Sequence, residues 1–184
     1  VFKSDMQARC DSLVFYSYDS IAHMFHNPVL WAENSQITAN HIEMHFLDKK
    51  PDKFYLNNNA FAIEQYDSVH FNQLKSRKMS GYIVEKKVRQ IDLHNDCQTI
   101  YFIVDEEVDE IVALNKVVST NMRIWLKDNK VENVWFFDKP DGETIPIEQL
   151  KDEQTFLKDF RFLDEYRPKS REDIFIWKEI PQNE

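Results

Sequence analysis

Two histidines of one short segment, His41 and His45, have the spacing that a metal-binding helix uses in the H-E-x-x-H motif. The residues around them alternate between apolar and polar types, which predicts a β-strand instead. Four residues of a strand span about 13 Å, so a single ion cannot contact both side chains. We therefore interpret these histidines as exposed strand residues and predict no metal site.

Cys10 and Cys97 are the only cysteines of the chain. Two cysteines are too few for a disulfide scaffold, and no C-x-x-C pair is present for zinc or redox chemistry. They could pair in an oxidising compartment, or both could be small buried residues, which is the interpretation that we favour. A cysteine nucleophile needs a neighbouring base that no motif identifies here, so we predict a non-enzymatic protein without a catalytic residue or cofactor.

The composition excludes several classes of function. Gly81 and Gly142 are the only glycines, so a glycine-rich phosphate loop cannot form. The net charge is −9 and no basic stripe is present, which argues against nucleic acid as a partner. No apolar run approaches the roughly 20 residues of a membrane-spanning helix. The chain begins at Val1 without a signal peptide, and we interpret it as a mature or trimmed fragment.

Strands must position any site that the chain has, and four segments with one shared pattern predict these strands. The segments begin at the small residues Cys10, Ala39, Ser76 and Ser119, and an apolar residue follows three positions later. Apolar side chains then recur at every second position, as on the buried face of a strand. A polar turn and a second strand follow in each unit, and Asn-rich breaks such as Asn57-Asn58-Asn59 act as turns.

We predict an all-β fold, an antiparallel β-jellyroll or taco-shaped solenoid of about four repeated units over residues 1–145. Residues 146–184 are expected to form a C-terminal cap of the same domain, packed over the last unit. The cap is expected to contain one or two helical turns after Pro146, a strand near 160–168 and a capping box from Ser170 to Asp173.

The inward faces of the predicted strands would share one apolar interior, which is the candidate site. Its predicted lining residues are Phe15, Ile42, Met44, Phe46, Phe54, Leu56, Met79, Ile83, Leu93, Met122, Ile124 and Leu126. A filled core and a groove for acyl chains would both use such residues, and flexible methionines suit either.

Two stretches, CDSLVFYSYDSIAHMFHNPVLWAENSQITANHIEMHF and NKVVSTNMRIWLKDNKVENVWFF, resemble the OstA-like/LptA-like family of periplasmic lipopolysaccharide-transport proteins. The shared unit is a small-x-x-apolar-x-aromatic strand, a short charged turn and a second strand. It covers residues 5–145 and is most similar to the OstA-like proteins of Bacteroidetes-type bacteria.

The resemblance implies a jellyroll that binds lipopolysaccharide or another acylated lipid in its interior. It also implies a periplasmic location, a role in outer-membrane assembly, and other OstA/Lpt-type β-domains that stack edge to edge as partners.

A second hypothesis is a structural scaffold whose interior is filled and whose edge strands dock protein partners by β-augmentation. A continuous groove between the sheets would favour the lipid hypothesis, and close packing from end to end would favour the scaffold. The residue pattern alone leaves both open.

Overall fold

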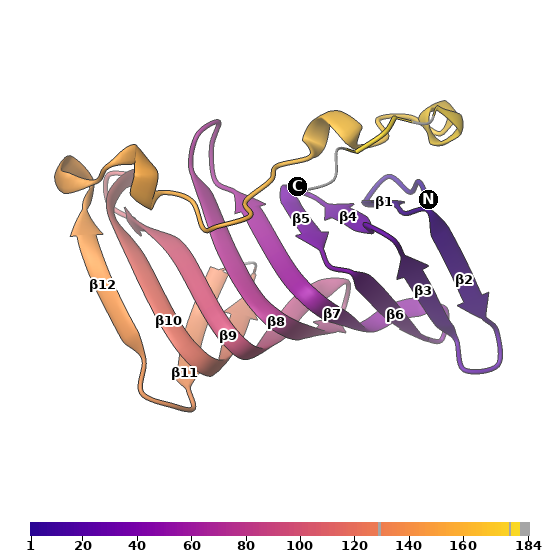
Figure 1. The fold of residues 1–184 in the computed structure, drawn as a ribbon, viewed down its shortest axis with the longest axis horizontal. Coiled ribbons are helices and arrows are strands. Elements are labelled where there is room, and N and C mark those ends of the chain that lie inside the picture. Colours follow the sequence, from indigo (N-terminus) through magenta and orange to yellow (C-terminus); the bar gives the residue numbers. More distant parts are fainter. Residues whose placement is uncertain (129, 177, 181–184) are drawn as a thin grey trace.

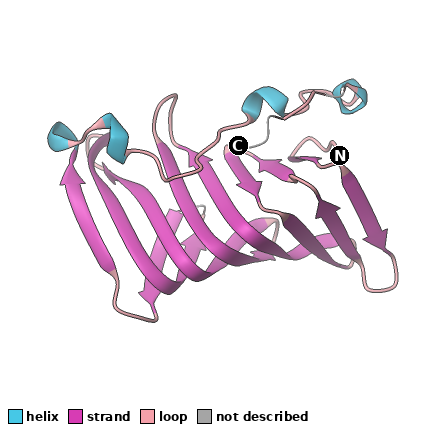
Figure 2. Cartoon of the chain, viewed as in Figure 1, coloured by secondary structure: helices cyan, strands magenta, loops and turns pink. Residues whose placement is uncertain are grey.

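The computed structural model describes residues 1–128, 130–176 and 178–180, in which twelve strands form one antiparallel sheet (Figure 1). The predicted all-β fold is therefore confirmed. Within these described residues, helical turns occur only in the C-terminal segment (Figure 2). The elements are β1 (Met6–Arg9), β2 (Ser12–Tyr16), β3 (Ile21–Phe25), β4 (Val29–Ala32), β5 (Ser35–Thr38), β6 (His41–Leu47), β7 (Lys50–Gln65), β8 (Phe71–Val84), β9 (Lys87–Asp105), β10 (Glu110–Lys127), β11 (Lys130–Phe136), β12 (Asp141–Pro146), and the 3-10 helices η1 (Ile147–Gln149), η2 (Asp152–Gln154), η3 (Asp164–Tyr166) and η4 (Glu172–Phe175).

The sheet folds back on itself into two layers because its longest strands bend near their middles. The first half of β7 pairs with β6 and its second half with β5, so the two halves lie in different layers. In the same way, β10 pairs with β12 along its first half and with β11 along its second half. We call the layer with β2, β3, β6 and β11 the first layer, and the layer with β1, β4, β5 and β12 the second layer.

The corner between the layers has a distinct backbone at three places where the chain passes from the first layer to the second, between β3 and β4, within β7 and within β9. Two consecutive residues there have positive φ angles, a conformation that Asn and Asp tolerate better than most residues. The prediction that the Asn run ends a strand is wrong, because β7 bends at this run and continues. The paired residues are His26 and Asn27, Asn58 and Asn59, and Asn95 and Asp96.

Small residues lie at the corner where the chain passes in the opposite direction. They are the residues that begin the four predicted segments, namely Cys10, Ala39, Ser76 and Ser119. The Oγ of Ser76 donates a hydrogen bond to the carbonyl of Lys78 at 2.7 Å, and that of Ser119 to the carbonyl of Asn121 at 2.9 Å. Each serine therefore satisfies a main-chain carbonyl next to the bend, which a larger apolar residue could not do.

Residues 147–176 extend farther than the predicted cap over the last unit. The segment leaves β12 and runs back across the outer face of the second layer toward β1 (Figure 1). Its Leu157 packs against Phe61, Ile100 and Leu114, which point away from the space between the layers. The second layer is thus covered on both faces, as its apolar content on both faces requires.

Two glutamines of the sheet hold this segment through its main chain. Gln73 of β8 donates to the carbonyl of Thr155 at 2.7 Å and accepts from the N–H of Leu157 at 2.8 Å. Gln36 of β5 repeats both bonds with Arg161 and Leu163, at 2.7 and 2.6 Å. These bonds replace the strand pairing predicted near 160–168, and that prediction is wrong.

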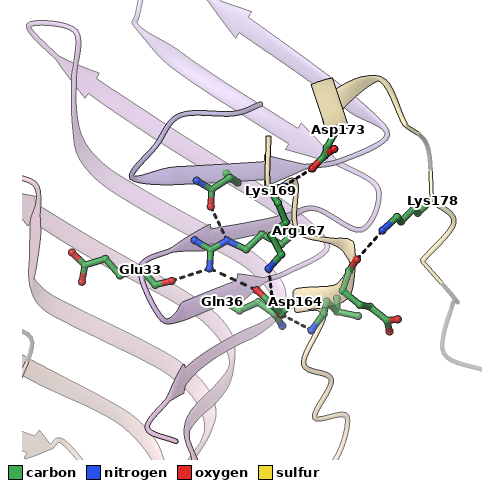
Figure 3. Close-up of polar contacts among 10 residues, drawn as sticks. Glu33, Gln36, Asp164, Arg167, Lys169, Asp173 and Lys178 are labelled. Atoms are coloured by element: carbon green, nitrogen blue, oxygen red, sulfur yellow. Dashed lines mark hydrogen bonds and ion pairs between the residues drawn. The ribbon is translucent and has the colours of Figure 1, made fainter. Parts of the chain in front are cut away.

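The end of the segment is fastened to the first strands of the second layer (Figure 3). Arg167 donates from Nε to Oε1 of Gln7 at 2.7 Å and from Nη1 to the carbonyl of Glu33 at 2.8 Å. The reciprocal hydrogen bonds of the predicted capping box are present between Ser170 and Asp173, at 2.9 and 3.3 Å, but η4 begins at Glu172, so its N-cap position is Arg171.

Candidate functional site

The space between the two layers is filled by one apolar cluster, and the structure places most of the predicted site residues in it. Paired residues of neighbouring strands point to the same face of a sheet, and the pairs Met44–Phe54 and Met122–Leu93 show that these residues line the first layer. The buried members are Ile42, Met44, Phe54, Leu56, Met79, Leu93, Met122 and Ile124, and Phe46, Ile83 and Leu126 are partly buried against them. Their role in binding a lipid remains a prediction.

Phe15 differs from the other predicted residues. It lies opposite Ala22 of β3 and therefore faces the interior, but 56% of it is exposed. The reason is that β2 is the edge strand of the first layer, so no further strand covers it. Its ring contacts Phe46 edge to face at a centroid distance of 6.1 Å. Phe15 thus belongs to the open end of the interior and not to the buried part.

The wall formed by the second layer was missed by the sequence analysis. Its interior residues are smaller, which lets the second layer lie close to the bulky side chains of the first. They include Ala8, Leu30, Ala39 and Ala60, with Ile37, Ala62 and Leu74 partly buried. A usable signal was present in the alternation of Ala60 and Ala62 with Phe61 and Ile63, which marks a strand half with two apolar faces.

Met24 of β3 is an interior residue that the predicted list omits, although its neighbour Phe25 lies on the outer face. Met24 is buried and pairs with Ile42, whereas Phe25 points outward and stacks on His41 at a centroid distance of 4.5 Å. The one-residue difference moves a side chain to the opposite face of the strand.

The two cysteines are unpaired thiols at the corner. Cys97 is fully buried, and burial raises its pKa to about 12, while its Sγ contacts the carbonyl of Thr120 at 3.2 Å. Cys10 is partly buried, and burial raises the pKa of this thiol as well. A thiol without appreciable thiolate is a poor nucleophile, so both residues act here as small packing groups.

The apolar interior continues beyond its buried part at both ends. At the first end, Leu13 and Phe15 of β2 are exposed on the interior face. At the other end, Val134 and Phe136 of β11 pair with Ile124 and Met122, and both are partly exposed. These side chains extend the apolar surface of the interior to both edges of the sheet.

A cavity of about 390 Å³ lies at the first end, between β1, the start of β2 and the C-terminal segment. Ala8, Cys10 and Leu13 form its interior side, and Tyr166 and Lys169 belong to the side made by the C-terminal segment. Its volume is within the usual range for small-molecule sites. The cavity thus has apolar residues on one side and polar and charged residues of the C-terminal segment on the other.

Along their open margin, the two layers are bridged by exposed ion pairs. Lys130, at the start of β11, lies 2.9 Å from Glu106 in the turn between β9 and β10. Lys86, between β8 and β9, lies 3.8 Å from Asp5 ahead of β1. The hydrogen bond from Lys130 lowers the pKa of Glu106. Exposed pairs of this kind contribute little to stability, so they close the margin only weakly.

Comparison with solved structures shows what this arrangement is similar to. The crystal structure of LptH, the LptA homologous periplasmic component of the conserved lipopolysaccharide transport device from Pseudomonas aeruginosa, matches with a TM-score of 0.54 at 10% identity. The match covers 76% of this chain and 93% of that chain. The chain has an LptA-like fold. The predicted resemblance is confirmed at the level of the jellyroll fold.

The remaining comparisons add little. No family model and no curated protein matches the sequence. Among the described residues, the LptA-like sheet is accompanied by no helix that is both long and apolar enough to cross a membrane.

Proposed function

We propose that this chain is a non-enzymatic periplasmic protein that carries acylated lipid, in the first place lipopolysaccharide, during outer-membrane assembly. The acyl chains occupy the interior between the two layers. The observation that carries the proposal is the continuous apolar face of the first layer in an LptA-like fold, which extends past its buried part to exposed residues at both ends.

The interior can accept a lipid only if the layers separate, and two features favour this. The open margin is held by exposed ion pairs, which are weak. The buried wall contains Met24, Met44, Met79 and Met122, whose unbranched and flexible side chains can repack around a guest. An acyl chain that replaces contacts between the layers keeps this surface out of water, so the hydrophobic contribution is largely retained.

Site-specific photocrosslinking tests the proposal. Benzoylphenylalanine is placed in turn at Phe15, Met44 and Ile124, the purified proteins are irradiated with lipopolysaccharide, and adducts are detected by immunoblotting. Lipid adducts are expected at all three positions, with Phe15 the most efficient because it is already exposed. Tyr55, an aromatic residue of β7 that pairs with Glu43 on the outer face, is the matched control and should give no adduct.

The scaffold function is the second candidate, and the close packing of the interior favours it. Partner β-domains would then add to the free edges of β2, β11 and β12, whereas the edge of β1 is already bonded by the N–H of Ala8 to the carbonyl of Val1 at 3.0 Å. In that case the inward positions yield no lipid adduct, and crosslinkers on β2 and β11 capture protein. Absence of lipid adducts at every inward position rejects lipid carriage.

A further inference from the structure

A cluster of metal-binding side chains lies on the outer face of the first layer, away from the lipid-carrying interior. Nδ1 of His23 on β3 lies 3.0 Å from Nε2 of His41 on β6. Oε1 of Glu43 lies 3.6 Å from Nδ1 of His41. One ligand atom from each of the three side chains falls within 4.8 Å of the other two.

The strand register explains why the cluster forms. His23 pairs directly with Glu43 across β3 and β6, and His41 is the next residue on the same face of β6. His41 and His45 are too far apart along one strand to share an ion, but side chains on neighbouring strands lie closer together. Residues facing each other on neighbouring strands have Cβ atoms about 4.5–5.5 Å apart, which is compatible with a shared ion.

The surroundings hold the candidate ligands in place. The rings of His41, Phe25 and His23 lie nearly parallel, with the His41 centroid 4.5 Å from Phe25 and 5.2 Å from His23, and the latter two 5.9 Å apart. Nδ2 of Asn57 donates to Oε1 of Glu43 at 3.0 Å, the kind of outer contact that orients a ligating carboxylate. The side chains of His41 and Glu43 are 23% and 25% exposed, so an ion can reach them while most of the surrounding water is excluded.

We propose that His23, His41 and Glu43 bind one Zn²⁺ ion, with water at the fourth position. Two imidazoles and a carboxylate suit this ion, which is commonly four-coordinate with nitrogen and oxygen ligands at about 2.0–2.2 Å. The three ligand atoms lie within 4.8 Å of one another, and rotation of the side chains would bring them together around the ion. The ion would link β3 to β6 beside the edge strand β2, and so stabilise the end of the sheet where Leu13 and Phe15 are exposed.

Calorimetric titration of the whole chain with ZnCl₂, in a buffer that does not chelate zinc, tests this site. A stoichiometry of one ion per chain is expected, together with a higher melting temperature in the presence of the metal, since a ligand that binds the folded state stabilises it. His23→Ala and His41→Ala are each expected to weaken binding by at least about tenfold. His94→Ala, a histidine of β9 outside the cluster, is the matched control and should bind as the unchanged protein does.

Circular dichroism establishes that each variant is folded, and His23→Gln replaces any alanine variant that is not. The absorption spectrum of the Co²⁺-loaded protein gives a second readout, because four-coordinate Co²⁺ absorbs strongly and this absorption should disappear with either histidine. Absence of saturable binding overturns the proposal. Binding of equal strength in the His23 and His41 variants also overturns it, because the ion would then be held elsewhere.

Discussion

The packing of the interior depends on a position that has no side chain. Gly81 of β8 lies opposite Phe54 of β7, and the ring of Phe54 covers it. A methyl group added at position 81 would overlap the ring atoms of Phe54. Because Phe54 is itself buried among other side chains of the first layer, its ring has little room to move away.

Gly81→Ala is therefore expected to lower the free energy of unfolding by about 1 to 3 kcal/mol, the usual cost of overpacking. Urea unfolding followed by fluorescence measures the change. Phe54→Leu removes the overlapping ring atoms, so its cost should be smaller when position 81 is alanine than when it is glycine. Strictly additive effects of the two substitutions would show that the ring does not limit position 81.

At the level of elements, the two layers exist because β7 and β9 bend without ending. Asn58 has a φ of 62° at the corner of β7, and its carbonyl accepts a hydrogen bond from the N–H of Asn40 at 2.9 Å. The bend is thus bonded to the chain that enters β6. Asn is one of few residue types that adopt this conformation at low cost.

Asn58→Val should destabilise the fold by about 1 to 2 kcal/mol, because a β-branched residue is strained at positive φ. Asn58→Gly is the matched control, and it should leave stability nearly unchanged since glycine adopts this φ freely. Thermal melting of both variants gives the comparison. Equal melting temperatures for the valine and glycine variants would mean that the corner does not depend on this backbone conformation.

The sequence predicted the first layer well because its large apolar side chains alternate regularly, as Ile42, Met44 and Phe46 do. It did not predict that an Asn run bends a strand, because the same residues also form turns that end strands. The second layer was missed since its interior residues are small. The His23–His41–Glu43 cluster was missed because it depends on the register of strands that are far apart in the sequence.

At the level of the whole molecule, the C-terminal segment covers an outer apolar face that no other element covers. Gln36 and Gln73 are almost completely buried beneath it, and each satisfies one main-chain donor and one acceptor of the segment. Nothing in the sequence marks these glutamines, because polar residues on a strand usually indicate a face in water. The prediction placed the cap over the last unit alone, whereas the segment extends from there across the second layer.

Gln36→Ala and Gln73→Ala should each loosen the segment, at a cost of about 1 to 3 kcal/mol for each buried group left without a partner. Limited proteolysis should cut the segment faster in both variants, and urea unfolding should give a lower midpoint. Gln98→Ala, on the same outer face of β9, is the matched control and should behave as the unchanged protein does. Unchanged proteolysis in both variants would show that the other contacts of the segment hold it without these glutamines.

The glutamine bonds also restrict how the C-terminal segment can vary. The hydrogen bonds of Gln73 and Gln36 to this segment go to main-chain atoms, so these bonds impose no choice of side chain at Thr155 or Arg161. They do fix the number of residues between the two bonded positions, because Leu157 and Leu163 must stay six residues apart to reach both glutamines. Substitutions along the segment should therefore be tolerated. A single insertion or deletion between these leucines should not be, because it would break the bonds to one glutamine and move Leu163 away from Trp31.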